Sequence, residues 1–173
     1  MKHLLTLLSI LITYSSSNGQ GQENLKIVWP EEYKWKIGSN QENETMHMME
    51  LIPGKEKIEK WTILGTMISI KGATNVPMDK AMNMMYDQAK QNAPDATLTL
   101  IEKNETAGNP WVIFKIEAPR FKNDKRPESQ LYYIIQGQTS LYSNFVALKE
   151  KKLSDDFVSK WKEIFKASEL VTQ

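Results

Sequence analysis

Hydrophobic and polar residues alternate in the first part of the chain, as they do in a strand with one buried face. Tyr33, Trp35 and Ile37 are separated by lysines, and residues 46–52 form a second segment rich in methionine. Because side chains two positions apart share one face of a strand, both segments are expected to be strands. The polar residues 38–45 between them are expected to form the turn of a hairpin.

After a third expected strand at residues 61–70, the spacing of the apolar residues changes to that of a helix. Apolar residues three or four positions apart form one stripe: Met78, Ala81, Met82, Met85 and Ala89. Pro77 opens this helix, because a proline in the first turn removes no hydrogen bond that the helix needs. Residues 92–94, Asn-Ala-Pro, end it.

Four further strands are expected, at residues 97–103, 111–117, 130–136 and 139–149. In the second of them every other residue is apolar (Val112, Phe114, Ile116), while Lys115 and Glu117 point the other way. This alternation predicts an antiparallel sheet with one more hydrated face. The short connections predict that the strands follow one another as a meander.

The last expected element is a helix that begins after Ser154, a preferred N-cap residue. Leu153 and Val158 occupy the two positions of a hydrophobic staple. An apolar stripe follows: Phe157, Val158, Trp161, Ile164 and Phe165. A helix with one apolar face must bury it, and the sheet is the available partner.

The predicted order is therefore β-β-β-α-β-β-β-β-α. This order indicates an α+β domain in which an antiparallel sheet, a hairpin plus a meander, is packed by two amphipathic helices. Tyr132 and Tyr142 lie on the last two strands, on either side of Gly137, and are expected to form a cross-strand pair.

The N-terminus has the pattern of a secretory signal peptide. Lys2 and His3 precede a nine-residue apolar run at residues 4–12, and small and polar residues follow up to Gly19. This apolar run is too short to span a bilayer. The expected organisation is a signal peptide at 1–19, a flexible lead-in at 20–26 and one domain at 27–171. The protein is expected to be secreted or periplasmic, without a lipid anchor, because the chain has no cysteine.

The element order resembles that of the PsbP-like family, the secreted bacterial relatives of a photosystem II extrinsic protein. Two local features carry the resemblance: the strand end at residues 50–53 followed by Trp61-Thr62, and the helix at residues 157–165. It covers about residues 25–170. The resemblance implies an α/β/α arrangement and a secreted accessory or binding domain rather than a reaction. It assigns no functional residue.

The amino-acid composition excludes several classes of reaction and binding site. Without cysteine there are no disulfides and no thiolate catalysis, and His47 is the only histidine outside the expected signal peptide. The glycine-rich motifs that bind nucleotides are absent, as is the Gly-x-Ser-x-Gly motif of serine hydrolases. We therefore expect no cofactor and favour a non-enzymatic protein. A small-molecule hydrolase using a cleft beside the sheet stays open as an alternative, because acidic residues are numerous.

A run of soft metal ligands lies in the second strand: Met46, His47, Met48 and Met49. Thioether and imidazole groups suit copper, so a Met/His copper-binding domain is a second alternative. Alternation opposes it, because Met46 and Met48 share one face while His47 and Met49 share the other. Methionines also fill gaps in cores.

One long loop, residues 118–129, is rich in cations: Arg120, Lys122, Lys125 and Arg126. Pro119 and Pro127 bracket them, and long loops often carry function. An unknown protein or an anionic small molecule is the expected partner of this loop, with a solvated connection as the alternative. The balance of 22 basic and 21 acidic residues gives no reason to expect nucleic acid as a partner. The sequence thus predicts a binding or accessory domain whose ligand is unknown.

Overall fold

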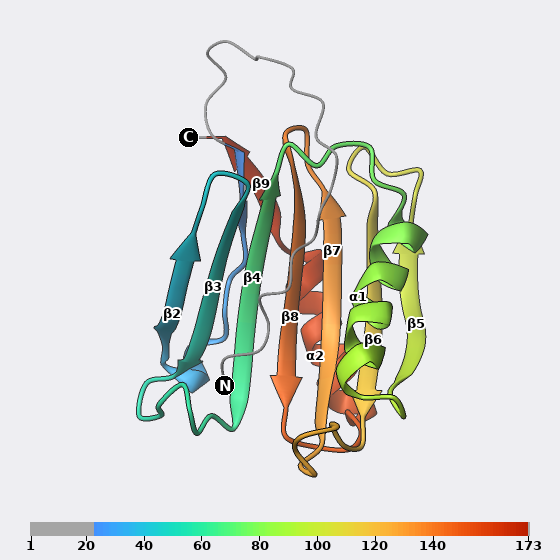
Figure 1. Ribbon diagram of the computed structural model, residues 1–173. Coiled ribbons are helices and arrows are strands. Elements are labelled where there is room, and N and C mark those ends of the chain that lie inside the picture. Colours follow the sequence, from blue (N-terminus) through green and yellow to red (C-terminus); the bar gives the residue numbers. More distant parts are fainter. Residues whose placement is uncertain (1–22, 173) are drawn as a thin grey trace.

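Seven strands form one antiparallel sheet in the spatial order β2-β3-β4-β8-β7-β6-β5 (Figure 1). The computed structural model describes residues 23–172. The strands are β2 (Trp35–Glu42), β3 (Met46–Pro53), β4 (Ile63–Lys71), β5 (Thr97–Asn104), β6 (Trp111–Ala118), β7 (Glu128–Gln136) and β8 (Ser140–Leu148). All seven overlap the predicted strands, although β2 overlaps its predicted segment only at residues 35–37. β4 pairs with β8, which joins the N-terminal hairpin to the meander.

Two helices cover opposite faces of this sheet. Figure 1 shows α1 (Met78–Asn92) in front of the sheet and α2 (Asp155–Lys166) behind it. Pro77 stands at the N-cap of α1. At the start of α2 the Ser154 hydroxyl accepts a hydrogen bond from the Phe157 N–H at 3.3 Å, which confirms the predicted cap. The fold is therefore α+β, with a helix on each face of an antiparallel sheet.

Each face of the sheet has its own core. On the α1 side, Met78 and Met82 pack with Phe114 and Ile134. On the α2 side the largest fully buried residues are Trp161 and Phe165 from the helix and Ile113, Leu131 and Val146 from the strands. Because successive strand residues point to opposite faces, the central strands supply apolar side chains to both cores.

The expectation of a more hydrated face is wrong for the centre of the sheet. Glu117 does point away from α1, but only 8 % of it is exposed, because α2 and the loop before it cover that face. Its carboxylate accepts a hydrogen bond from the Leu153 N–H at 2.9 Å and pairs with Lys115 at 3.0 Å. A buried carboxylate needs such partners. The hydrogen bond from Leu153 to Glu117 holds the loop before α2 against β6.

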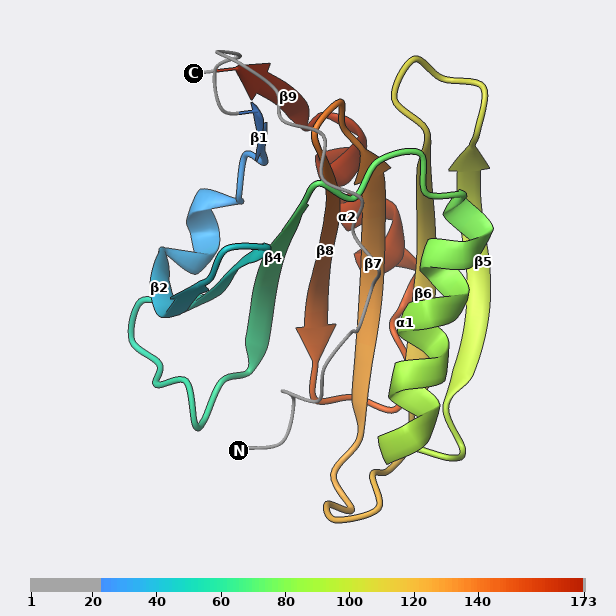
Figure 2. The same cartoon turned by 45° about the horizontal axis from the view of Figure 1, so that its top comes forward.

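The prediction of a flexible lead-in is wrong for residues 23–26. They form β1 (Glu23–Lys26), which pairs with the C-terminal β9 (Glu169–Thr172) in a separate two-stranded sheet. The carboxylate of Glu23 accepts hydrogen bonds from the N–H groups of Gln138 and Thr139, in the β7–β8 turn. The short helix η1 (Glu31–Tyr33) then leads the chain into β2 (Figure 2). The predicted signal peptide and residues 20–22 lie outside the described residues.

The hairpin turn is shorter than predicted. β2 continues to Glu42, and the turn occupies residues 43–45, where the Asn43 side chain accepts hydrogen bonds from the Thr45 and Met46 N–H groups. The polar residues 38–42 belong to an edge strand, whose side chains stay hydrated, so their polarity did not mark a loop. The register shifts between Ile37 and Ser39, where Gly38 forms a bulge.

The expected pair of Tyr132 and Tyr142 is also wrong. Tyr132 lies opposite Phe145, and Tyr142 lies opposite Ile135. The observed pairing differs by three positions from the expected one, and an odd difference moves a side chain to the other face. Tyr132 consequently stacks on Phe114 in the α1-side core, with ring centroids 4.8 Å apart, while Tyr142 belongs to the α2 side.

Candidate functional site

An open groove lies on the α2 side of the sheet, over strands β3, β4 and the neighbouring part of β8. Its volume is about 510 Å³, within the range of pockets that hold small molecules. The chain from Asn24 to Trp29 forms one wall, and Val171 of β9 lies beside it. Figure 1 shows α2 behind β8, β7 and β6, so the helix leaves this part of the sheet to the N-terminal segment.

The strand register arranges the floor of the groove in rows that cross the sheet. In one row Met49 of β3 lies opposite Met67 of β4, which lies opposite Asn144 of β8. In the next row His47 lies opposite Ser69, and Ser69 opposite Tyr142. These rows line the groove, together with Leu51 and Ile37. The floor is therefore apolar toward Leu51 and polar toward His47.

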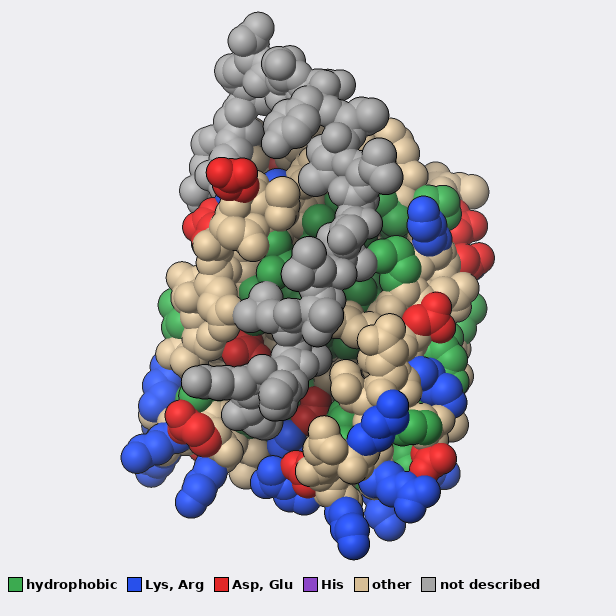
Figure 3. Space-filling view, viewed as in Figure 1, with side chains coloured by type: hydrophobic (Ala, Val, Ile, Leu, Met, Phe, Trp, Pro, Cys, Tyr) green, Lys and Arg blue, Asp and Glu red, His purple; other side chains and the backbone are tan. Residues whose placement is uncertain are grey.

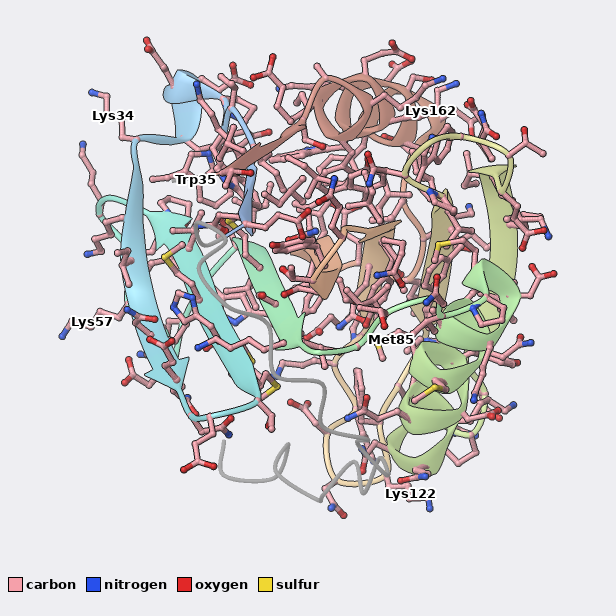
Figure 4. The ribbon with its side chains drawn as sticks, turned by 90° about the horizontal axis from the view of Figure 1, so that it is seen from above. Lys34, Trp35, Lys57, Met85, Lys122 and Lys162 are labelled. Carbon is pink, nitrogen blue, oxygen red and sulfur yellow. The ribbon has the colours of Figure 1, made fainter. Side chains whose placement is uncertain are left out.

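The apolar end of the groove is closed by an aromatic cluster. Trp29 and Trp35 line the groove, and behind them lies Trp161 of α2. The ring centroids of Trp29 lie 5.3 Å from Trp35 and 5.5 Å from Trp161, with the planes steeply inclined. Figure 4 shows Trp35 on the same side of the sheet as Lys162 of α2. Edge-to-face packing of this kind adds to the stabilisation from burial.

Gly65 in β4 lets the indole of Trp29 lie directly on the sheet. A Cβ atom at this position would come within 2.4 Å of Trp29 Cζ3. Only glycine permits this approach without displacing the ring. The floor beside the groove is thus shaped by the absence of a side chain, and Trp29 forms the boundary between the groove and the buried core.

The three indole N–H groups of this cluster are buried, and within residues 23–172 they have no hydrogen-bond partner. A buried donor without an acceptor costs free energy. The rings of Trp29, Trp35 and Trp161 are steeply inclined to one another, and edge-to-face packing of aromatic rings adds stabilisation that offsets part of that cost. The cluster is a rigid wall rather than a polar recognition element.

The polar end of the groove is organised by side chains from β2. The His47 Nε2 atom lies 2.7 Å from Asn40 Oδ1, which fixes the orientation of the imidazole. Glu42 lies opposite His47 in the register and pairs with Lys71 of β4 at 2.6 Å. This pairing lowers the pKa of Glu42, chiefly through the Lys71 hydrogen bond. The carboxylate therefore stays ionised next to the imidazole.

Tyr142 fastens the N-terminal wall to the floor. Its hydroxyl donates a hydrogen bond to the Glu23 carbonyl oxygen at 2.8 Å. Burial, reinforced by the Glu23 carboxylate, raises the pKa of Tyr142 to about 12. The neutral hydroxyl is thus the form that the fold stabilises. The groove depends on this contact, because Glu23 begins the strand that forms its wall.

The described residues that line the groove include no carboxylate. The hydrogen-bond partner of His47 is the amide of Asn40. General acid–base chemistry needs a titratable group within hydrogen-bond reach of its partner. The hydrolase alternative stays a prediction, to which this lining adds no carboxylate.

The methionine and histidine run divides between the two faces as alternation predicts. His47 and Met49 line the groove, whereas Met46 and Met48 point to the α1 side. Sequence reasoning missed Met67, which lies directly across from Met49 and also lines the groove. Only the pairing of β3 with β4 identifies it, since 18 positions separate the two residues. In the described chain no three His, Cys, Asp or Glu side chains form a metal cluster.

The basic loop, residues 118–129, joins β6 to β7 at the lower end of the sheet in Figure 1. Arg120 pairs with Asp95 at 2.8 Å and Arg126 with Asp124 at 2.7 Å, while Lys122 and Lys125 form no ion pair within residues 23–172. The Arg126 hydrogen bonds hold the pKa of Asp124 at about 2. Figure 3 shows lysine and arginine side chains gathered at this end of the molecule. Anion binding by the loop stays a prediction, with two of its four cations already paired.

The chain matches no protein-family model, and no curated protein is significantly similar to it. None of the helices in the described region is both long and apolar enough to cross a membrane. The groove and its lining are therefore the basis for assigning a function.

Proposed function

We propose that this protein is a non-enzymatic binding domain that holds a small amphipathic molecule in the groove. The observation that carries the proposal is the gradient along the floor. Trp29, Trp35 and Leu51 make one end apolar, and His47, Ser69 and Tyr142 make the other end polar. Binding sites for small molecules combine an apolar lining with a few placed polar groups, and this groove has both.

The lining also suits a ligand whose shape varies. Met49 and Met67 lie in the middle of the floor, and methionine side chains adapt to irregular partners. Ile37, at the rim of the groove, is 58 % exposed. Contact with an apolar ligand would remove this surface from water, which is the main source of affinity for such molecules.

The test compares two exposed apolar residues on the two edge strands. Ile37 of β2 lines the groove, whereas Leu100 of β5, 47 % exposed, lies at the opposite edge of the sheet. Both stand beside a register shift, so they are matched in context. The probe is anilinonaphthalene sulfonate, an aromatic apolar molecule with one charged group, followed by fluorescence.

We expect Ile37→Gln to weaken binding of this probe about tenfold, because about 1–2 kcal/mol of apolar contact is lost. Leu100→Gln should leave the affinity unchanged. Thermal melting of both variants controls for loss of the fold. Equal affinities for the two variants would overturn the assignment of the ligand to this groove.

We further propose that the domain acts outside the cytoplasm, as a secreted or periplasmic binding or accessory protein of the PsbP-like type. The support is the signal-peptide pattern at residues 1–19 and the element order. Intact-mass measurement of the exported protein should show loss of the first 19 to 21 residues. An exported chain that retains residues 4–12 would contradict this localisation.

A further inference from the structure

The floor of the groove brings together three soft metal ligands from two strands. His47 and Met49 come from β3 and Met67 from β4, and all three line the same cavity. We propose that these three side chains bind one Cu(I) ion. The inference goes beyond the binding of an amphipathic molecule and does not depend on it, since it rests on the ligand atoms rather than on the apolar surface.

The register provides the geometry. Met49 and Met67 are direct cross-strand partners, so their Cβ atoms lie about 4.5–5.5 Å apart on one face. His47 is two positions before Met49, about 6.5–7 Å along the same strand and on the same face. Each methionine has three rotatable bonds, which lets its sulfur reach a point between the three residues. All three residues are half-buried, which leaves an ion a path to them.

The hydrogen bond of His47 leaves one ring nitrogen for the metal. Asn40 Oδ1 is an acceptor, so the 2.7 Å contact suits the tautomer with the proton on His47 Nε2, in which the Nδ1 lone pair can bind a metal. Metal-binding histidines are held in this way, with the other N–H donated to a fixed acceptor. Asn40 is thus a positioning residue of the proposed site.

The donor set selects the ion. Two thioethers and one imidazole are soft, neutral ligands, which favour Cu(I) over Mg²⁺, Ca²⁺ or Mn²⁺. The four consecutive residues 46–49 cannot bind one ion together, because Met46 and Met48 point to the other face of the sheet. Met67 replaces them, and the site exists only when β3 and β4 are paired.

The experiment uses Ag(I), a soft ion of the same charge without redox chemistry, and the full chain labelled at the methionine methyl groups. In NMR titrations the Met49 and Met67 signals should shift together up to one equivalent, while the Met46 and Met48 signals stay in place. Met67→Leu should weaken Ag(I) binding at least tenfold, because losing even an outer partner of a metal site costs about 10–100-fold.

Met48→Leu is the matched control, since it removes a thioether from the same strand but from the other face, and it should bind Ag(I) as the wild type does. Leucine preserves apolar volume, so Met67→Leu should still bind anilinonaphthalene sulfonate. This separates failure of the metal site from failure of the ligand groove. Shifts confined to methionines other than Met49 and Met67, or an unchanged affinity in Met67→Leu, would overturn the proposal.

Discussion

The α2 side of the sheet has two halves built from the same strand pattern but with different covers. Under α2, strands β6, β7 and β8 contribute to a closed core around Trp161 and Phe165, both fully buried. Over β3 and β4 the cover is the thin segment from Asn24 to Trp29, and four floor residues there are only half-buried: His47, Met49, Met67 and Ser69. Alternation decides which side chains share a face, and the covering element decides whether that face becomes core or groove.

The side chains differ accordingly. The closed half is packed with aromatic rings, which bury much area in fixed orientations. The floor of the open half carries Met49 and Met67, whose flexible side chains can adapt to a ligand that binds reversibly. Trp29 and Trp35 stand on the boundary and belong to both halves. The contrast predicts that changes in the closed half affect stability, while changes in the open half affect binding.

The largest effect is expected in the closed half. Trp161→Ala removes a side chain with no exposed surface from the centre of the aromatic cluster, and we expect a loss of about 3–5 kcal/mol in the free energy of unfolding. Glu163→Ala, on the exposed side of the same helix, should change it by less than about 0.5 kcal/mol. Chemical denaturation measures both. Similar small losses for the two variants would show that the cluster does not hold the α2 side together.

A smaller effect is expected at the boundary. In Gly65→Ala the new methyl group meets the ring of Trp29, and overpacking of this kind costs about 1–3 kcal/mol. The variant should also weaken binding of anilinonaphthalene sulfonate, because Trp29 lines the groove. Gly108→Ala is the matched control, since a methyl group there meets nothing within 4 Å. Thermal melting and the fluorescence titration should separate the two variants, and an unaltered Gly65→Ala protein would contradict the close approach of Trp29.

The last effect, which is confined to alkaline pH, is a pH dependence at the polar end of the groove. The folded-state pKa of Tyr142, about 12, lies above its unfolded value of about 10. The unfolded chain therefore loses this proton first. The stabilisation is complete below about pH 10 and disappears as the pH rises toward 12.

Tyr142→Phe should consequently lose less stability over this interval than the wild type does, as measured by urea denaturation at a series of pH values. Leu100→Gln, which changes no titratable group and lies at the opposite edge of the sheet, should keep the wild-type dependence. Identical curves for wild type and Tyr142→Phe would argue against a hydroxyl held neutral by the wall of the groove.

Much of the secondary structure could be predicted from local signals. The Ser154 side chain caps the start of α2, and Pro77 stands at the N-cap of α1. The start of each helix therefore depends on a few neighbouring residues. The strands of the meander followed from alternation. Their pairing did not, and the expected Tyr132–Tyr142 contact failed because the turn after β7 sets a register that composition does not reveal.

The candidate site was predicted less well, because it depends on contacts between distant segments. The sequence singled out His47 and Met49 but grouped them with Met46 and Met48. Part of the wall of the groove lies in residues expected to be flexible, since a four-residue segment with three polar residues, such as β1, forms a strand only when β9 is there to pair with it.

Local patterns in the amino-acid sequence are sufficient to predict the class of fold, the two amphipathic helices and the division of the Met46–Met49 run between two faces. These depend on the spacing of side chains along one segment, which the backbone geometry of a helix or strand converts directly into direction. Three other features could not be predicted in this way: Met67 lies beside Met49, the ring of Trp29 packs on Gly65, and Glu23 holds β1 over the sheet. Those contacts join residues far apart in the chain, and their formation depends on packing and register across the whole sheet.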